Sequence, residues 1–368
     1  MTAPRRRINF GFDRFSGAYL WVLFIVVFGV WTPSLFLTSS TLHSVASQEA
    51  IAAMLGIAVL VPLVAGAYDL SVGSVINLST IVVVVLQTSH HWGMWPAIFV
   101  AIGVSVVIGV VNGFLVVKLR VNSFIATLGM ATVVTAIQEI VSGESQPLPP
   151  VSHAWNALTQ TKVFGFQIVV LYLIILAFIV WWALEHTPVG RYLYAVGGNP
   201  EAARLSGVNV DKWTWVAMIA SSTICGIAGV FYASLTGPSL TFGSSLLLPA
   251  FAAAFLGSTQ LKPGRFNVWG SMLAIYVLAT GVKGLQLVTG KQWLNDMFNG
   301  VALVGAVAFA VWRQRVAGSK PTAAPEPSEA EAQATGPGGA GSTREAVPAS
   351  QHATAAGPDP AHVQSTAQ

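Results

Sequence analysis

The sequence predicts an all-α integral membrane protein with about ten transmembrane helices, some of them short or broken, and a disordered C-terminal tail. Of the 368 residues, 54% are hydrophobic and only 9% are charged, which is too little polar surface for a soluble domain. Apolar runs follow one another at short intervals, and a bilayer core about 30 Å thick needs roughly 20 mainly apolar residues per helix. Because lipid cannot satisfy backbone polar groups, the embedded runs are expected to be helical.

Ten apolar runs qualify as membrane spans. The third and the eighth are shorter than a full crossing, which is typical of broken or closely packed helices beside a transport pathway. Tilted, irregular spans would give the same pattern. In order, the runs are residues 18–37, 50–67, 74–86, 95–117, 124–141, 166–184, 214–232, 246–256, 269–287 and 296–312.

Positively charged residues predict the orientation of these spans. If the N-terminus lies in the cytoplasm, every lysine and arginine except Lys162, Lys283 and Lys291 falls on the cytoplasmic side. The positive-inside rule favours this arrangement, and only an even number of spans preserves it. We therefore expect a multi-pass protein of the inner (plasma) membrane with both termini in the cytoplasm.

The chain is expected to divide into a basic N-terminal segment, a membrane domain with all ten spans, and a tail. Residues 1–17 are basic and cytoplasmic, and the apolar run behind them is interpreted as an uncleaved first helix, because the cleavage-like triplet 44–46 lies too far downstream. Residues 18–312 form the membrane domain, which includes a cytoplasmic loop at 190–212. Residues 313–368 contain no Phe, Trp, Tyr, Leu, Ile or Met. Such a tail cannot bury enough apolar surface to offset its ordering entropy, so we expect it to be disordered.

The loop 190–212 is the longest internal cytoplasmic connection, and its sequence predicts a helix of about two turns. Asn199 is a favourable N-cap, Pro200 suits the first helical position, and Gly207 suits the left-handed residue that ends a helix. Two turns are too few to be stable alone. The helix therefore needs a surface against which to pack.

Three side chains of this short helix indicate what that surface is. Glu201 complements the positive end of the helix, while Ala202 and Leu205, three residues apart, form a small apolar face. Such a face suits a groove on another protein. Packing on the chain's own cytoplasmic surface is the alternative.

Polar residues within the apolar runs are candidates for a solute pathway. Asp69 is the acidic residue between the second and third runs, and an ionisable group at membrane depth costs several kcal/mol unless it is paired or hydrated. With Ser71 it either caps a broken helix or lines the pathway, and both hypotheses stay open. Hydrogen bonds to a hydroxylated solute or to neighbouring helices would explain the others equally well, namely Asn77, Asn112, Thr127 and Gln138.

Four stretches of the sequence together resemble one family. They are Asp69-Leu70-Ser71-Val72-Gly73-Ser74, then Asn112-Gly113 with Phe124-Ile125-Ala126-Thr127-Leu128-Gly129, then Gly190 to Gly207, and finally Phe255-Leu256-Gly257-Ser258 with Pro263-Gly264-Arg265 and Asn299-Gly300. In this order, over about residues 50–315, they are similar to permease subunits of ribose-type sugar ABC importers, in the branched-chain/monosaccharide permease family. The sequence departs from that pattern at Tyr68, Asn122 and Gln138-Glu139.

The resemblance implies that the loop couples the permease to a separate ATP-binding cassette ATPase subunit. It also implies a periplasmic or lipid-anchored solute-binding protein and a second permease copy, either identical or a close paralogue. The implied cargo is a monosaccharide such as ribose, xylose, arabinose or galactose, or alternatively a nucleoside. The residues implied in ATPase coupling are Gly190, Arg191, Gly197, Gly198, Asn199, Pro200, Glu201, Ala202, Ala203, Arg204 and Gly207.

Several function classes are not supported by the sequence. It contains no Gly-Lys-Ser/Thr phosphate-binding loop, so ATP and Mg²⁺ are expected on the partner ATPase and no cofactor is expected in this chain. No Ser-His-Asp or metal-ligand cluster suggests an enzyme. Basic residues are scattered rather than gathered on one face, which argues against nucleic acid as a partner. Membrane lipid is the expected surrounding.

An ion-coupled secondary transporter that works alone is the rival hypothesis, with Asp69 as the coupling carboxylate. Proton chemistry is disfavoured because no second buried titratable group is obviously paired with Asp69. The two hypotheses differ in whether uptake survives Asp69→Asn and fails on Ala202→Glu.

Overall fold

The computed structural model describes residues 12–291 and 293–318, with side chains described for residues 15–291 and 293–308. Arg5, Arg6 and Arg7 of the predicted basic segment lie outside the described residues. So does the predicted tail beyond Gly318.

Within the described part, one long helix lies at each of the ten predicted spans, and the predicted all-α fold is confirmed. The long helices are α1 (Phe12–Trp31), α3 (Ser39–Val64), α4 (Val72–Thr88), α5 (Met94–Gly113), α6 (Ser123–Ser142), α8 (Ile168–His186), α11 (Val210–Thr236), α12 (Phe242–Ser258), α13 (Val268–Thr289) and α14 (Trp293–Gly318). The short elements are α2 (Pro33–Phe36), η1 (Phe114–Lys118), α7 (His153–Gln160), β1 (Lys162–Val163), β2 (Phe166–Gln167), α9 (Pro188–Gly198) and α10 (Pro200–Leu205).

Six of the described helices are long and apolar enough to cross a membrane: α3, α5 with η1, α6, α8, α11 and α13. Helices α1, α4 and α12 are apolar but shorter over their described hydrophobic part. The two runs predicted to be short became α4 and α12, which at 17 residues each are the shortest of the ten long helices. Pro249 lies inside α12, where it removes a backbone hydrogen bond.

The first and last spans differ from their predicted bounds. α1 begins at Phe12, within the predicted basic segment, and ends at Trp31, because Pro33 disfavours helical backbone in the residue before it and starts α2. α14 runs on to Gly318, into the region predicted as tail. Its polar extension includes Arg313, Gln314 and Arg315, and arginine and glutamine are good helix formers.

Helix α3 is the centre of the packing. Every residue from Ala50 to Val64 is buried, and α3 packs against α8, α11, α12 and α13. Helix α11 also packs closely on α5, where a side chain on Gly109 would collide with the backbone of Ile219. The small residue therefore permits a close helix approach.

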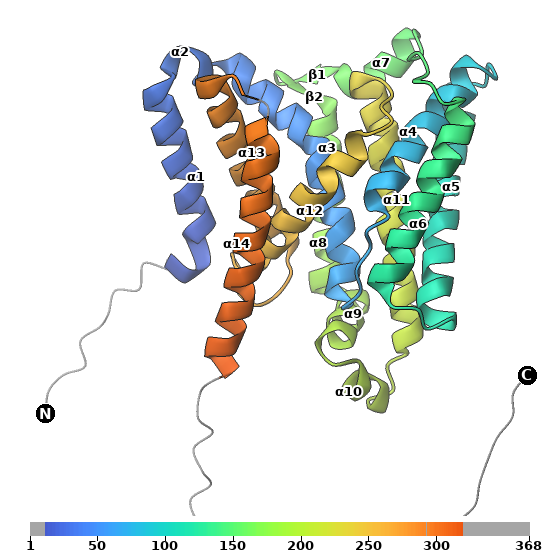
Figure 1. The fold of residues 1–368 in the computed structure, drawn as a ribbon, viewed down its shortest axis with the longest axis vertical. Helices are drawn as coiled ribbons and strands as arrows, with labels where there is room; N and C mark the ends of the chain where they lie inside the picture. Colours follow the sequence, from blue (N-terminus) through green and yellow to red (C-terminus); the bar gives the residue numbers. More distant parts are fainter. Residues whose placement is uncertain (1–11, 292, 319–368) are drawn as a thin grey trace, which may run out of the picture. The chain divides into compact units, whose positions relative to one another are not determined.

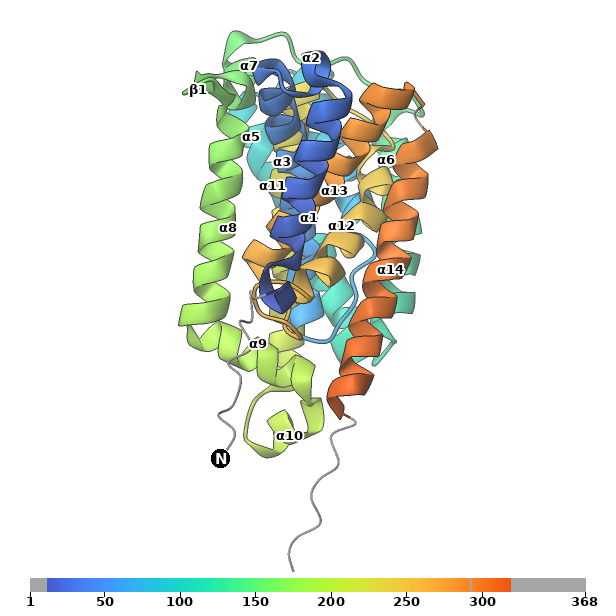
Figure 2. The same ribbon diagram turned by 90° about the vertical axis from the view of Figure 1, so that its left-hand side faces the viewer.

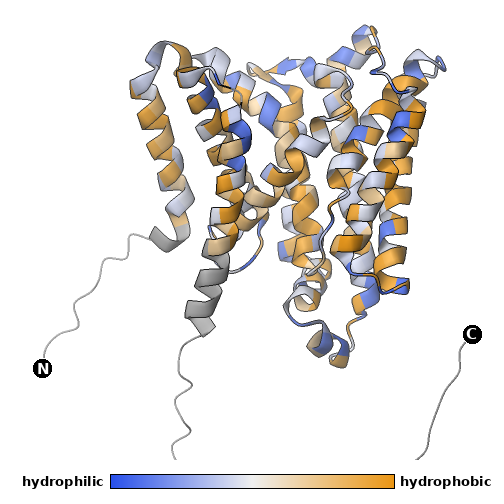
Figure 3. Ribbon diagram, viewed as in Figure 1, coloured by the Kyte–Doolittle hydropathy of each residue, from blue (hydrophilic) through white to orange (hydrophobic). Residues whose placement is uncertain are grey.

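Helices α9 and α10 lie together at one end of the long helices (Figures 1 and 2). We call this the α10 end. The described beginning of α1 and the described end of α14 lie at the same end (Figures 1 and 2). Hydrophobic residues dominate the length of the helices, and hydrophilic residues gather at both ends (Figure 3).

Candidate functional site

The connection between α8 and α11 contains the short helix that the sequence predicted. The Asn199 side-chain oxygen accepts a hydrogen bond from the Ala202 N–H at 3.0 Å, and Pro200 occupies the first turn. At the other end, Gly207 has a φ of 83°, and its N–H donates to the Arg204 carbonyl at 3.0 Å. The Val208 N–H donates to the Ala203 carbonyl at 3.0 Å, which completes a glycine-terminated C-cap. α10 is thus capped at both ends.

A second helix, α9, precedes it, and two glycines of α9 permit close backbone contacts. A Cβ atom on Gly190 would collide with the backbone of Leu184 in α8, and one on Gly197 would collide with the carbonyl of Val64 at the end of α3. Gly198, the next residue, has open space around its Cα atom. Two of the predicted coupling glycines, Gly190 and Gly197, are therefore needed for packing.

Aromatic side chains of α9 attach it to two further segments. The Tyr192 ring stacks on Trp213 of α11, with ring centroids 5.0 Å apart. The Tyr194 hydroxyl donates to the Phe266 carbonyl at 2.6 Å, and the Arg265 guanidinium lies 3.6 Å from the Tyr194 ring centroid. Burial raises the pKa of Tyr194, so its hydroxyl keeps its proton. α9 therefore contacts α3, α11 and the chain that leads into α13.

Charged residues connect α10 to its surroundings. Arg204 lies 3.2 Å from Glu201 and 4.0 Å from Asp211 of α11, and Arg120 lies 3.1 Å from Asp211. Exposed pairs of this kind contribute about 0–1 kcal/mol each. They orient α10 rather than stabilise it strongly. Arg191, on α9, is exposed.

One face of α10 points away from the rest of the chain. Leu205 is 89% exposed, and Glu201 and Ala202 are exposed beside it. We call these three residues the α10 face. Ala203 is only 5% exposed, so it packs inward and anchors the helix.

Four of the predicted pathway residues meet around the non-helical chain that joins α3 to α4. Asp69 is fully buried, and one of its oxygens accepts from the Ser71 N–H at 3.0 Å and from the Ser71 hydroxyl at 2.6 Å. Its other oxygen accepts from the Ser221 hydroxyl of α11 at 2.9 Å. Asn112 of α5 donates to the Ser71 hydroxyl at 2.8 Å, and Thr127 of α6 accepts from the Leu70 N–H at 3.0 Å.

This Asp69 cluster joins the α3–α4 connection to three helices. Ser221 was not predicted, although the pair Ser221-Ser222 inside an apolar run was a usable signal. Asp69 forms no ion pair with any described residue. Its hydroxyl and amide partners are those of a structural junction.

The other two predicted pathway residues lie elsewhere, against the chain that leads into α12. Asn77 donates to the Leu240 carbonyl at 3.0 Å and accepts from the Gly243 N–H at 2.6 Å. Gln138 donates to the same Leu240 carbonyl at 3.1 Å. The hydrogen bonds therefore place the six residues in two separate interhelical clusters.

Among the described residues, no group of three or more His, Cys, Asp or Glu side chains could hold a metal ion. Cys225 is buried and has no disulfide partner.

Comparison with known proteins agrees with this architecture. Residues 41–307 match the family described as branched-chain amino acid transport system / permease component. The fructose import permease protein FrcC of Rhizobium meliloti is 30% identical over 309 residues, covering 80% of this chain and 84% of that protein. The ribose import permease protein RbsC of Escherichia coli K12 is 27% identical over 296 residues, covering 78% and 90%. The D-allose transport system permease protein AlsC of the same strain is 25% identical over 313 residues, covering 83% and 95%. The resemblance found in the sequence is confirmed, and the chain belongs to the branched-chain amino acid transport system permease family.

Proposed function

We propose that this chain is the transmembrane permease subunit of an ATP-binding cassette importer for a monosaccharide, and that a separate ATPase subunit docks on α10. The α10 face carries the proposal. A two-turn helix cannot hold itself together alone, yet this one is capped at both ends and presents Leu205 at 89% exposure. An exposed leucine on a small, well-formed helix suits a groove on a partner protein.

The contacts of α9 give the docked subunit a mechanical connection to the membrane helices. A displacement of α10 acts on α9, whose Gly197 abuts the end of α3 and whose Tyr192 stacks on α11. Tyr194 adds the chain that leads into α13. Closure of two ATPase subunits on ATP would thus shift a permease pair between inward-facing and outward-facing packings, by moving α9 and α10 as a unit.

Charge supports the assignment of the α10 end to the cytoplasm. Arg120, Arg204, Lys262 and Arg265 all pair with acidic residues at this end. Basic residues near span ends favour the cytoplasmic side. The described beginning of α1 and the described end of α14 lie there too (Figures 1 and 2). This agrees with an inner-membrane protein whose two termini are both in the cytoplasm.

A monosaccharide cargo is supported by the three relatives described above, which are named as permeases for fructose, ribose and D-allose. A solute-binding protein would deliver the sugar at the end opposite α10. The ion-coupled alternative has less support, because both Asp69 oxygens are occupied by hydroxyl and amide hydrogens. In this proposal ATP and Mg²⁺ belong to the ATPase, and no cofactor is assigned to this chain.

The test is uptake of radiolabelled monosaccharides by proteoliposomes that contain the permease, its ATPase and its solute-binding protein. Leu205→Glu and Ala202→Glu should abolish ATP-dependent uptake and release the ATPase from the permease in a pull-down. Leu148→Glu is the matched control, since Leu148 is 80% exposed in the loop after α6, away from α10. ATP-dependent uptake that survives both α10 substitutions would refute the docking role. Import of nucleosides but not of sugars would show that the cargo is a nucleoside and not a monosaccharide.

A further inference from the structure

A polar cavity of about 250 Å³ lies between α3, α12, α13 and α14. Its polar wall combines amide, carboxylate, ammonium and hydroxyl side chains from four helices. Those used below are Gln48 and Glu49 of α3, Lys283 and Gln286 of α13, and Asn295, Asp296 and Asn299 of α14. None of these seven residues belongs to the Asp69 cluster.

We propose that this polar cavity binds the neutral, polyhydroxylated solute inside the permease, an inference that rests on the proposed function. Amide side chains both donate and accept hydrogen bonds, a carboxylate accepts, and an ammonium donates. Sugar hydroxyls do both. Asp296 of α14 also lines the cavity, so two carboxylates and one ammonium group face the solute. This set disfavours an anion, and its carboxylates accept hydrogen bonds from solute hydroxyls.

Glu49 and Lys283 are available to bind a ligand in the cavity. Neither Glu49 nor Lys283 forms an ion pair within 4.0 Å with a described residue, and neither takes part in a hydrogen bond there. Glu49 is half-buried within α3. A charge at such a place requires water or a polar ligand, since its isolation in an apolar interior is costly.

The volume fits a small solute. Cavities that hold drug-sized ligands measure roughly 300–1,000 Å³, so about 250 Å³ suits a molecule smaller than a drug. Pro249 and Ile275 form part of the apolar remainder of the wall. A site with an apolar body and a few convergent polar groups is typical of small-molecule binding.

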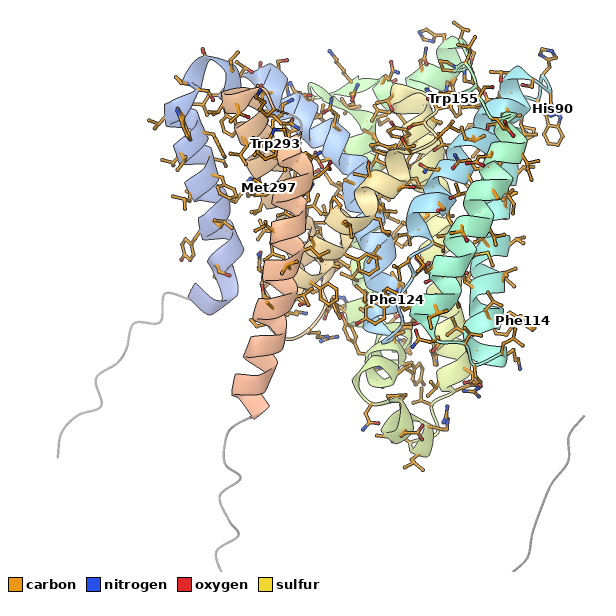
Figure 4. The ribbon with its side chains drawn as sticks, in the orientation of Figure 1. His90, Phe114, Phe124, Trp155, Trp293 and Met297 are labelled. Atoms are coloured by element: carbon orange, nitrogen blue, oxygen red, sulfur yellow. The ribbon has the colours of Figure 1, made fainter. Side chains whose placement is uncertain are left out.

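A second, more open pocket lies beside the first. It measures about 500 Å³, shares Gln286, Asn295 and Asp296 with the first, and is also lined by Lys291 and Trp293. Figure 4 shows Trp293 on the upper part of α14, at the end opposite α10. Figure 3 shows hydrophilic turns among hydrophobic ones in this part of α13 and α14. Solute that arrives at this end would therefore meet polar side chains that line both pockets.

A neighbouring cavity has a mainly apolar lining, in contrast to the polar cavity. The space of about 410 Å³ between α1, α3 and α13 shares Lys283 but is otherwise lined mainly by apolar residues such as Trp21, Ile25 and Leu42. It suits a lipid chain and offers few partners to hydroxyl groups. The polar residues are therefore concentrated on the α12 and α14 side of α13.

The test combines uptake kinetics with protection of introduced cysteines, both in the assembled transporter. Asn295→Ala, Glu49→Gln and Lys283→Met should each raise the half-saturating sugar concentration about tenfold, as expected for a lost hydrogen bond to a charged or amide group. Glu144→Gln is the control, because Glu144 is an exposed carboxylate in the loop after α6. It should leave uptake unchanged.

Cysteine labelling reports occupancy without relying on transport. In a Cys225→Ala background, millimolar transported sugar should slow reaction of Asn295→Cys and Gln286→Cys with a small hydrophilic thiol reagent. Ser145→Cys, exposed in the loop after α6, should react at an unchanged rate. A monosaccharide that cannot be transported should protect none of the three.

The outcomes separate this inference from the proposed function. Sugar uptake without cysteine protection, and with unchanged half-saturation in the cavity variants, would overturn the cavity and leave the importer intact. Absence of sugar uptake by the unaltered transporter would refute the proposed function, and absence of protection in the same sample would overturn the cavity as well. Protection without uptake would uphold the site alone.

Discussion

Gly66, in the chain that follows α3, lies directly against Gly197 of α9. A Cβ atom on Gly66 would stand 3.2 Å from the Gly197 Cα atom, and Gly66 has a φ of 76°, a conformation that favours glycine. The two glycines bring the proposed docking region within backbone contact of the segment that carries Asp69. A displacement of α9 would therefore press on the junction between α3 and α4.

Gly197→Ala should impair coupling. The added methyl group would collide with the Val64 carbonyl, and overpacking of this kind costs about 1–3 kcal/mol. We expect ATP-dependent uptake to fall about tenfold, while the ATPase still binds the permease in a pull-down.

Gly198→Ala is the matched control for that substitution. Gly198 is the next residue on α9, and a Cβ atom there meets nothing within 4 Å. Its uptake should equal that of the unaltered protein. Equal uptake by both alanine variants would show that the contact between α9 and α3 does not transmit the motion.

Asn199→Ala should weaken α10 without affecting the membrane helices. The substitution removes the bond from the Ala202 N–H, and loss of an N-cap typically costs about 1 kcal/mol. Amide hydrogen exchange of residues 201–205 should accelerate about fivefold, and ATPase affinity should fall to a similar extent. Ser152→Ala is the control, because it removes the corresponding cap of α7, in which the Ser152 hydroxyl accepts from the Trp155 N–H. It should change neither the amide exchange of α10 nor the affinity for the ATPase.

Asp69→Asn should retain ATP-dependent uptake within about threefold. The amide keeps an oxygen that can accept from Ser71, and Ser221 has a hydroxyl that can accept as well as donate. Uptake should show no dependence on an imposed proton gradient. Loss of uptake in a stably folded Asp69→Asn variant, together with gradient-driven uptake by the unaltered chain alone, would favour the ion-coupled transporter.

Asn77→Ala should destabilise the protein more than it alters solute affinity. The change leaves the buried Gly243 N–H without its acceptor, and an unsatisfied buried group costs about 1–3 kcal/mol. The melting temperature in detergent should fall by several degrees, and the half-saturating sugar concentration should stay within twofold. A tenfold rise at unchanged melting temperature would instead place Asn77 on the pathway.

The double variant Asn77→Ala, Gln138→Ala tests the shared acceptor. Both amides donate to the Leu240 carbonyl, so their effects on stability should be non-additive. Additive losses would mean that the two side chains act independently.

The sequence was most informative where the determining interactions are local. The caps of α10 involve residues within a few positions of one another, so Asn199 and Gly207 could be recognised before any tertiary structure was known. The spans follow from apolar composition in the same way. α9 was missed because its helix depends on packing against α3 and α11 rather than on its own caps.

Long-range contacts could not be predicted. Asp69 and its partner Ser221 are 152 positions apart, and nothing in either local pattern indicates the other. Glu49 and Asn295 lie at the edges of predicted spans, where polar residues are ordinary, so their convergence on one cavity depended on how α3 and α14 pack. The polar residues deep in the predicted spans, such as Asn77 and Gln138, were predicted to line a pathway, and in the structure they form hydrogen bonds to other segments of the chain.

The enclosure of α3 has a consequence for how the chain is made in the cell. α3 is inserted early, but α11, α12 and α13, which cover it, are synthesised more than a hundred residues later. Until then lipid must surround a helix that is buried from Ala50 to Val64 in the finished protein. Residues 50–64 of α3 are all apolar, so lipid can surround this part of the helix at little cost, and its small residues later allow close helix packing. A polar substitution on this helix would therefore act during biogenesis, before any solute is transported.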